Sequence, residues 1–146
     1  MANDTMRKFG FPDSLIRDYE HWVVLLRPAQ VTLCSLVLAA KGNAEAFGQL
    51  PPGAHAELAT VTKEIEETLV AETGYEKINY LMLMMVDPHV HFHVLPRYPG
   101  SKSFNEISVS DVGWPGQPDL TSAVRLGPDE FKLLRDRLSQ NWLPAC

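Results

Sequence analysis

Three histidines alternate with apolar residues near the middle of the chain, at His89, His91 and His93. The residues that separate and follow them are apolar: Val90, Phe92 and Val94. Because successive side chains of a strand point to opposite faces, this pattern predicts three imidazoles on one face and a buried apolar row on the other. A single histidine on such a strand is usually a hydrogen-bonded polar residue, but three in strict alternation carry a desolvation cost that packing does not explain.

Nucleophilic catalysis at phosphorus is the chemistry that this arrangement favours. Imidazole is a good nucleophile near neutral pH because its unperturbed pKa is about 6.5. In this interpretation His91 attacks a phosphate, while His89 and His93 hold the phosphate oxygens and transfer protons. A covalent intermediate on His91 divides one difficult displacement into two easier ones.

A zinc site is the second chemistry that histidines allow. Same-face neighbours on a strand lie roughly 6.6–7 Å apart and the outer pair about 13 Å apart, whereas a Zn–N bond is about 2.0–2.1 Å. His89 and His93 therefore cannot share an ion unless the strand bends. Two of the histidines, such as His91 and His93, need a third ligand from elsewhere, so a zinc enzyme stays an alternative and no metal site is assigned.

The segment from His89 to Leu95 resembles the His-x-His-x-His-x-x signature, with apolar x, of the histidine triad family of nucleotide hydrolases and transferases. The similarity extends over roughly residues 20–98. Trp114, Pro115 and Gly116 are similar to a Trp-Pro segment of some bacterial members. The triad is the specific part of this resemblance, and the remainder supports it.

The resemblance implies an α+β fold with a five-stranded antiparallel sheet, continued across a homodimer as ten strands. It implies substrates in which a nucleoside monophosphate carries a leaving group on its α-phosphate, namely dinucleoside polyphosphates, phosphoramidates or acyl adenylates. His91 is then the nucleophile, His93 contacts the α-phosphate, and the main chain of His89 accepts a hydrogen bond from the ring of His91. No cofactor is required, although a polyphosphate can bring Mg²⁺ with it.

Two positions depart from the family pattern. Ser35 stands where many members have a fourth histidine, and Arg27 stands where an Asn or Asp often contacts the ribose. Both are candidate nucleotide-binding residues, together with Asn79 and with Arg97, whose guanidinium matches a phosphate in a bidentate way. The departures motivate an alternative of another class, a nucleotide-binding or sensing protein with little turnover.

The order of the expected elements favours an α+β fold over a doubly wound parallel sheet. We expect one domain over residues 1–146, with the two strand pairs separated by a helix. The helix is expected to end at Gly74, because glycine readily adopts the left-handed conformation of a helix C-terminus. The expected elements are an N-terminal arm over 1–20, strands over 21–26, 31–40, 78–86 and 89–96, helices over 54–73 and 128–143, and a long irregular segment over 97–127.

Composition excludes several classes of protein. Apolar residues make up 45% and charged residues 21%, which is a globular balance. The net charge of −5 and the lack of a basic run argue against a nucleic-acid partner. No run is long enough for a membrane helix, and no secretory signal is visible. The two cysteines, Cys34 and Cys146, fit a reducing compartment, so we expect a cytoplasmic protein. The family resemblance implies that its partners are a small nucleotide and a second copy of the chain.

Overall fold

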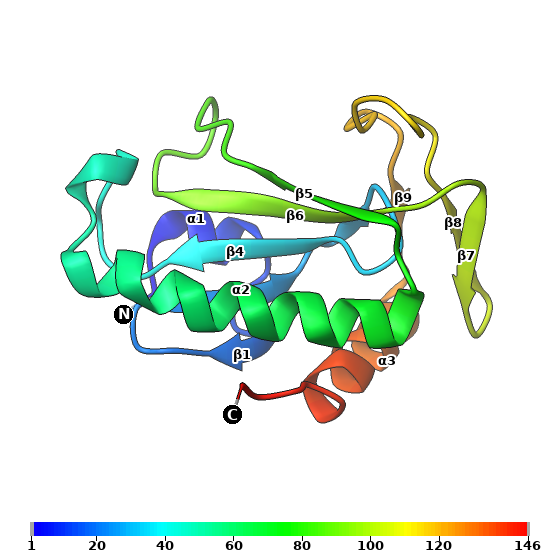
Figure 1. The fold of residues 1–146 in the computed structure, drawn as a ribbon, viewed down its shortest axis with the longest axis horizontal. Coiled ribbons are helices and arrows are strands. Elements are labelled where there is room, and N and C mark those ends of the chain that lie inside the picture. Colours follow the sequence, from blue (N-terminus) through cyan, green and yellow to red (C-terminus); the bar gives the residue numbers. More distant parts are fainter. Residues whose placement is uncertain (1, 146) are drawn as a thin grey trace.

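A five-stranded antiparallel sheet forms the centre of the computed structural model, which describes residues 2–145 (Figure 1). Cys146 lies outside the described residues. The α+β class and the five-stranded antiparallel sheet are as predicted. In spatial order the strands are β1 (Leu15–Asp18), β2 (Trp22–Leu26), β4 (Leu36–Ala40), β6 (His91–Arg97) and β5 (Lys77–Leu81).

The long helix α2 (Pro52–Thr73) connects β4 to β5 and packs along one face of the sheet (Figure 1). Its buried row includes Val61, Ile65 and Leu69. The helix begins two residues before the predicted start, since proline is well tolerated in a first turn. It ends as predicted at Gly74, which has a φ of 63° and donates its N–H to a carbonyl of the last turn.

The opposite face of the sheet is covered by the short helix α1 (Asp4–Lys8). Met6 packs there against apolar side chains of β2 and β4. Asn3 fixes the helix: its Oδ1 accepts the N–H of Met6 at 2.9 Å, and its Nδ2 donates to the carbonyls of Ala40 and Gly42. The N-terminal arm predicted over 1–20 contains regular structure, namely α1 and β1.

The predicted strand over 31–40 is too long at its start. Residues 31–35 form a turn, in which Cys34 has a φ of 69°, and β4 begins only at Leu36. The buried side chain of Gln30 stabilises this turn by accepting the N–H groups of Cys34 and Ser35 and donating to the carbonyls of Arg27 and Ser35. An apolar run thus hides a turn whose hydrogen bonds come from one polar side chain.

The two strands next to the histidines are also shorter than predicted. Strand β5 starts at Lys77 and stops at Leu81, and residues 82–90 form a loop in which Met84 has a φ of 55°. Strand β6 begins at His91 rather than at residue 89. The apolar residues of this loop read as strand in the sequence, yet Met85 is 85% exposed.

The segment over 97–127 is not irregular throughout, and the last helix is shorter than predicted. The segment over 97–127 contains a hairpin of β7 (Ser101–Phe104) and β8 (Ile107–Ser110). It also contains β9 (Val124–Arg125), which pairs with β3 (Ala29–Gln30). Helix α3 (Pro128–Gln140) stops before residue 143. Because α1 was not predicted, residues 2–145 contain three α-helices instead of two. None of the helices within residues 2–145 has the length and apolar composition needed to span a membrane.

A buried carboxylate holds the C-terminal segment on α2. Glu64 accepts hydrogen bonds from the hydroxyl of Tyr19 at 2.7 Å, from Nε1 of Trp142 at 3.0 Å and from the N–H of Ala145 at 2.9 Å. Burial alone raises the pKa of a carboxyl, but these three donors outweigh burial and hold the pKa of Glu64 below its ordinary value. Glu64 is therefore ionised in the folded protein at neutral pH.

We predict that Glu64→Gln lowers the free energy of unfolding by about 2 kcal/mol at pH 7, because an NH₂ group replaces one acceptor among three donors. A group whose pKa is lowered by folding stabilises above its unfolded value and loses that contribution as the pH falls. The difference between the two proteins should hence shrink below pH ~4.5. Urea unfolding at pH 7 and pH 4 measures it, with exposed Glu67→Gln as the control. Equal losses at both pH values would contradict the prediction.

Candidate active site

The imidazoles of His91 and His93 lie side by side on β6. Their ring centroids are 5.2 Å apart with an interplanar angle of 83°, and both residues are buried. His93 is paired with Val37 on β4 and with Leu81 on β5, so its position is fixed from both edges of the strand. Phe92 points to the other face and packs against Trp22 at 6.0 Å between centroids.

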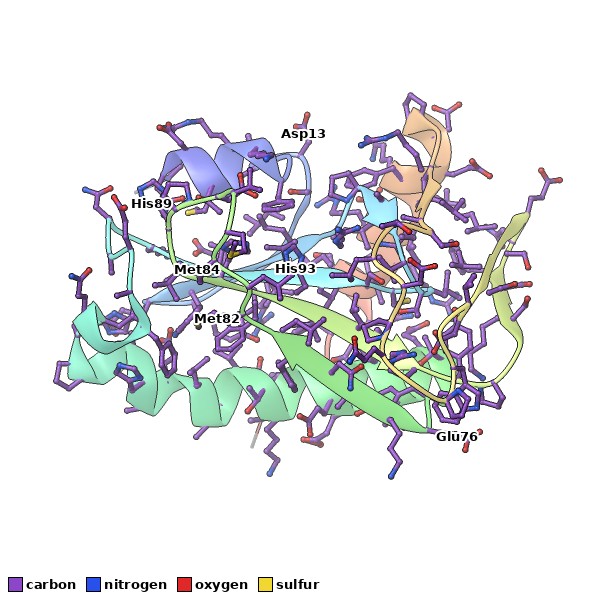
Figure 2. The ribbon with its side chains drawn as sticks, turned by 90° about the horizontal axis from the view of Figure 1, so that it is seen from above. Asp13, Glu76, Met82, Met84, His89 and His93 are labelled. Atoms are coloured by element: carbon purple, nitrogen blue, oxygen red, sulfur yellow. The ribbon has the colours of Figure 1, made fainter. Side chains whose placement is uncertain are left out.

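The ring of His89 does not join the other two. It lies before β6 starts, and its Nδ1 is 3.1 Å from Oγ1 of Thr5 on α1. Figure 2 shows His89 next to α1, away from His93 in the centre of the sheet. His89 therefore lies outside the strand predicted over 89–96, although its ring is on the α1 side of the sheet, as are the rings of His91 and His93.

The main chain of His89 nevertheless contacts the central histidine. Nδ1 of His91 is 2.8 Å from the carbonyl oxygen of His89. A carbonyl can only accept a hydrogen bond, so Nδ1 of His91 carries the proton. In the neutral ring the lone pair is then on Nε2, the nitrogen that is free to attack.

His91 and His93 open into a pocket of about 320 Å³. One wall comes from α1, where the ring of Phe9 lies 5.6 Å from the ring of His91 and 5.7 Å from that of His93. The other wall is the loop after β5, and Figure 2 shows Met84 beside His93. The lining residues are Lys8, Phe9, Arg27, Leu83, Met84, Met85, Val86, Asp87, His91 and His93.

Arg27 is the cation next to the histidines. Its Nε donates to Nδ1 of His93 at 3.4 Å, and its other partner among residues 2–145 is the carbonyl of Ala29. Lys8, by contrast, is paired with Asp87 at 2.8 Å. Burial, the charge of Arg27 and the neighbouring His91 lower the pKa of His93 to about 4, so His93 is neutral at pH 7. Since its Nδ1 accepts from Arg27, its proton is on Nε2.

Searches against protein-family models and against curated proteins found no match. Solved structures do match. A histidine triad protein from Sinorhizobium meliloti is 22% identical, covers 97% of this chain and 96% of its own, and has a TM-score of 0.73. A histidine triad protein from Bradyrhizobium japonicum is 17% identical over 98% of both chains, with a TM-score of 0.70. The chain has the histidine triad fold.

A third match is more distant in sequence. The diadenosine triphosphate hydrolase of Plasmodium falciparum is 6% identical, covers 88% of this chain and 76% of its own, and has a TM-score of 0.64. The resemblance drawn from residues 89–95 is thus confirmed by the fold. On this histidine triad fold, the signature residues His91 and His93 lie on β6, an interior strand of the sheet between β4 and β5.

Ser35 does not line the pocket into which His91 and His93 open. It is buried in the turn over 31–35, where its hydroxyl donates to the carbonyl of Thr32 at 2.7 Å and accepts the N–H of Thr32 at 3.0 Å. The hydroxyl is therefore occupied within its own turn, and the structure gives no support to its predicted contact with a nucleotide.

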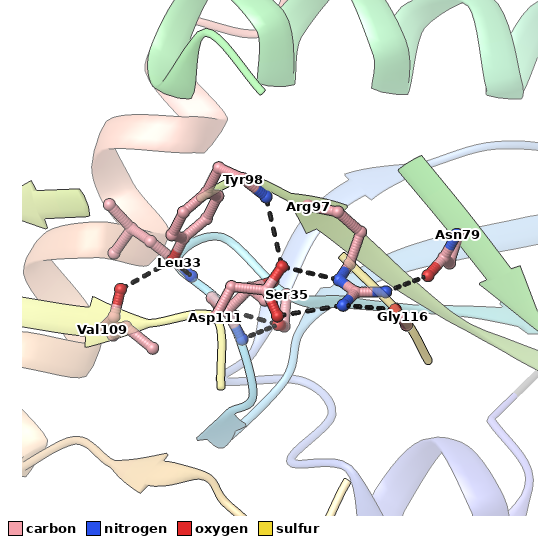
Figure 3. Close-up of polar contacts among 9 residues, drawn as sticks. Leu33, Ser35, Asn79, Arg97, Tyr98, Val109, Asp111 and Gly116 are labelled. Atoms are coloured by element: carbon pink, nitrogen blue, oxygen red, sulfur yellow. Dashed lines mark hydrogen bonds and ion pairs between the residues drawn. The ribbon is translucent and has the colours of Figure 1, made fainter. Parts of the chain in front are cut away.

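Arg97 and Asn79 lie further along the same face, outside the histidine pocket. The guanidinium of Arg97 binds Asp111 at 2.7 and 3.0 Å, Oδ1 of Asn79 at 2.7 Å and the carbonyl of Gly116 at 2.9 Å (Figure 3). Arg97 and Asp111 are both buried. The donors of Arg97 are thus occupied within the protein, and its predicted contact with a phosphate is not supported. Arg97 instead holds the segment around Trp114, and this segment lines a separate pocket together with Asn79.

Two other findings bear on the site. Within residues 2–145, no three or more His, Cys, Asp or Glu side chains are grouped so that they could hold a metal ion. Helix α1 and the residue after it also bring Thr5, Lys8 and Phe9 to the histidines, and none of these three was predicted from the sequence. Their only signal was Asn3, a residue type that favours helix N-termini.

We predict that Arg27→Gln raises the pKa of His93, because the positive charge of the guanidinium beside the ring is removed. Burial persists, so the value should stay below 6.5. Imidazole ¹⁵N NMR across pH 3–8 measures it, and Arg7→Gln, an exposed arginine, is the control.

The sign for stability follows from the same shift. The unfolded chain takes up this proton near pH 6.5 and the folded chain only near pH 4, so acidification through that window costs stability. An unchanged pKa of His93 in Arg27→Gln would show that Arg27 does not act on this ring.

Proposed function

We propose that the protein is a nucleotide hydrolase or nucleotidyl transferase that acts on the α-phosphate of a nucleoside monophosphate bearing a leaving group. The observation that carries the proposal is the hydrogen bond from Nδ1 of His91 to the carbonyl of His89. It directs the lone pair of a buried imidazole into the pocket. A histidine held in this way is suited to nucleophilic attack at phosphorus.

The proposed reaction consists of two displacements. Nε2 of His91 attacks the α-phosphorus, a P–N bond forms, and the bond to the leaving group breaks with its electron pair going to the leaving group. The ring of His91 then carries positive charge next to the carbonyl of His89. Water attacks the same phosphorus, the P–N bond breaks, the lone pair returns to Nε2, and the proton of the water is released.

Two neighbouring groups favour charge on the phosphate oxygens. His93 is neutral and has its Nε2–H available, and Arg27 lies beside it without a carboxylate partner among residues 2–145. The chain carries a net charge of −5, so a phosphate must be bound by such local donors. We assign Arg27 to the phosphate in place of the ribose contact that the sequence analysis considered.

The comparisons support this class of reaction. One structural neighbour is a diadenosine triphosphate hydrolase, which favours dinucleoside polyphosphates among the possible substrates. The mechanism uses no cofactor, and Mg²⁺ arrives with such a substrate. We further propose that the protein acts in the cytoplasm. Its substrate is a small nucleotide and not a nucleic acid, because the chain lacks a basic run.

We predict that acid-quenched wild-type protein, mixed with adenylate and guanylate dinucleotides or phosphoramidates, gains the mass of one nucleotidyl group. His91→Ala should gain none, and its kcat should fall about a thousandfold or more because a nucleophile is lost. Intact-protein mass spectrometry with parallel product analysis measures both. His55→Ala is the control, since His55 is an exposed histidine on α2.

The outcomes separate the two classes of function. Tight binding of a nucleoside monophosphate without product from any leaving group would favour a nucleotide-binding or sensing protein. Full activity of His91→Ala would overturn the proposed mechanism.

We also propose that the protein is a homodimer. Strand β5 is at one edge of the sheet, so one of its sides carries backbone groups that are not paired within the chain. Pairing with β5 of a second copy would produce the ten-stranded sheet that the family resemblance implies.

We predict a mass of twice 16.3 kDa in sedimentation experiments at micromolar concentration. Proline placed singly through residues 77–81 should dissociate the dimer, without unfolding it, only where the N–H points away from β6, because proline cannot donate. Proline at matching positions of β1, the other edge strand, is the control. A monomer at every concentration contradicts this proposal.

A further inference from the structure

Helix α1 contacts the loop that leads into β6 at two points. Oγ1 of Thr5 contacts His89, and Nζ of Lys8 is 2.8 Å from Oδ1 of Asp87. At its other end the helix is tied to the end of β4 and the residues that follow it through Asn3. The helix is thus linked both to the sheet and to the loop that carries the residue that orients His91.

The hydroxyl of Thr5 contacts both the main chain and the ring of His89. It is 1% exposed, and its Oγ1 accepts the main-chain N–H of His89 at 3.2 Å and lies 3.1 Å from Nδ1 of the same residue. A threonine hydroxyl has one proton and two lone pairs. With one lone pair occupied by the N–H of His89, the hydroxyl meets Nδ1 of the His89 ring with its proton or with its second lone pair, according to which ring nitrogen is protonated.

These contacts determine where the carbonyl of His89 points. Thr5 holds the N–H and the ring of His89, and the next N–H, of Val90, donates to the carbonyl of Ala44 at 3.1 Å. The peptide between His89 and Val90 is therefore restrained from both sides. Its carbonyl is the group that accepts the Nδ1 proton of His91 at 2.8 Å.

We propose that Thr5 is a positioning residue for catalysis, acting through His89 on the tautomer of His91. This inference rests on the proposed function. The first histidine of the motif is then a structural link between α1 and the nucleophile, and the phosphate is left to His93 and Arg27. Phe9, one turn further along, covers the rings of both His91 and His93, which brings the same helix to the site a second time.

The test compares Thr5→Val, which removes the hydroxyl but keeps the shape, with Thr5→Ser, which retains it. We expect Thr5→Val to lower kcat about tenfold with little change in KM. The variant would misorient the imidazole of His91, which acts in the chemical step and not in substrate binding. Thr5→Ser should restore kcat to within about twofold of wild type. Thr73→Val is the matched control, since the buried hydroxyl of Thr73 donates to the carbonyl of Leu69 and accepts the N–H of Tyr75 at the end of α2, on the other face of the sheet.

The spectroscopic readout is the tautomer of His91 in imidazole ¹⁵N NMR. Wild type, Thr5→Ser and Thr73→Val should carry the proton on Nδ1, whereas Thr5→Val should populate the Nε2–H form. If Thr5→Val does not fold, Thr5→Cys replaces it, because a thiol has a similar size and hydrogen-bonds weakly.

An unchanged tautomer together with wild-type kcat in the folded Thr5→Val or Thr5→Cys variant would overturn the inference. If wild type turns over no substrate, the proposed function fails, and the tautomer comparison still decides the role of Thr5.

Discussion

The pairing of β6 on both of its edges is the constraint on which the rest of the site depends. Between β4 and β5, this strand cannot shift by one residue without turning its apolar row out of the core. His91 and His93 therefore point to one face and Phe92 to the other. The two imidazoles are positioned by the sheet itself, and only the elements that surround them come from loops and from α1.

The elements that were predicted from the sequence are those whose stability comes from a regular buried row. Strand β2 and helix α2 have such rows, and so does the part of β6 that carries the motif. Apolar runs do not show where a strand stops. Each of the apolar runs over 31–40 and 78–86 contains a residue with positive φ, where the extended conformation is interrupted. Strand β4 begins only after Cys34, and strand β5 ends before Met84.

Helix α1 could not be predicted from local periodicity, because its five residues are too few to show one. It is stabilised by contacts that are distant in the sequence, such as Asn3 to Ala40 and Thr5 to His89. Contacts between residues distant in the sequence also explain why some candidate site residues were predicted incorrectly. The proposed role of His91 follows from its motif and from the family resemblance, whereas the contacts of Arg97 depend on Asp111 and Gly116. No pattern around Arg97 shows that its donors are already occupied.

The place of α2 in the chain has a consequence for the order in which the molecule folds. Strands β1, β2 and β4 follow one another closely and can pair by short closures. The pairing of Ala39 with His91 instead closes a loop of roughly fifty residues that includes all of α2, and the entropy of that closure must be offset before the pairing is gained. The strand that carries His91 and His93 thus joins the sheet late. A partly folded chain with its first three strands and α2 in place would still lack the pocket into which His91 and His93 open.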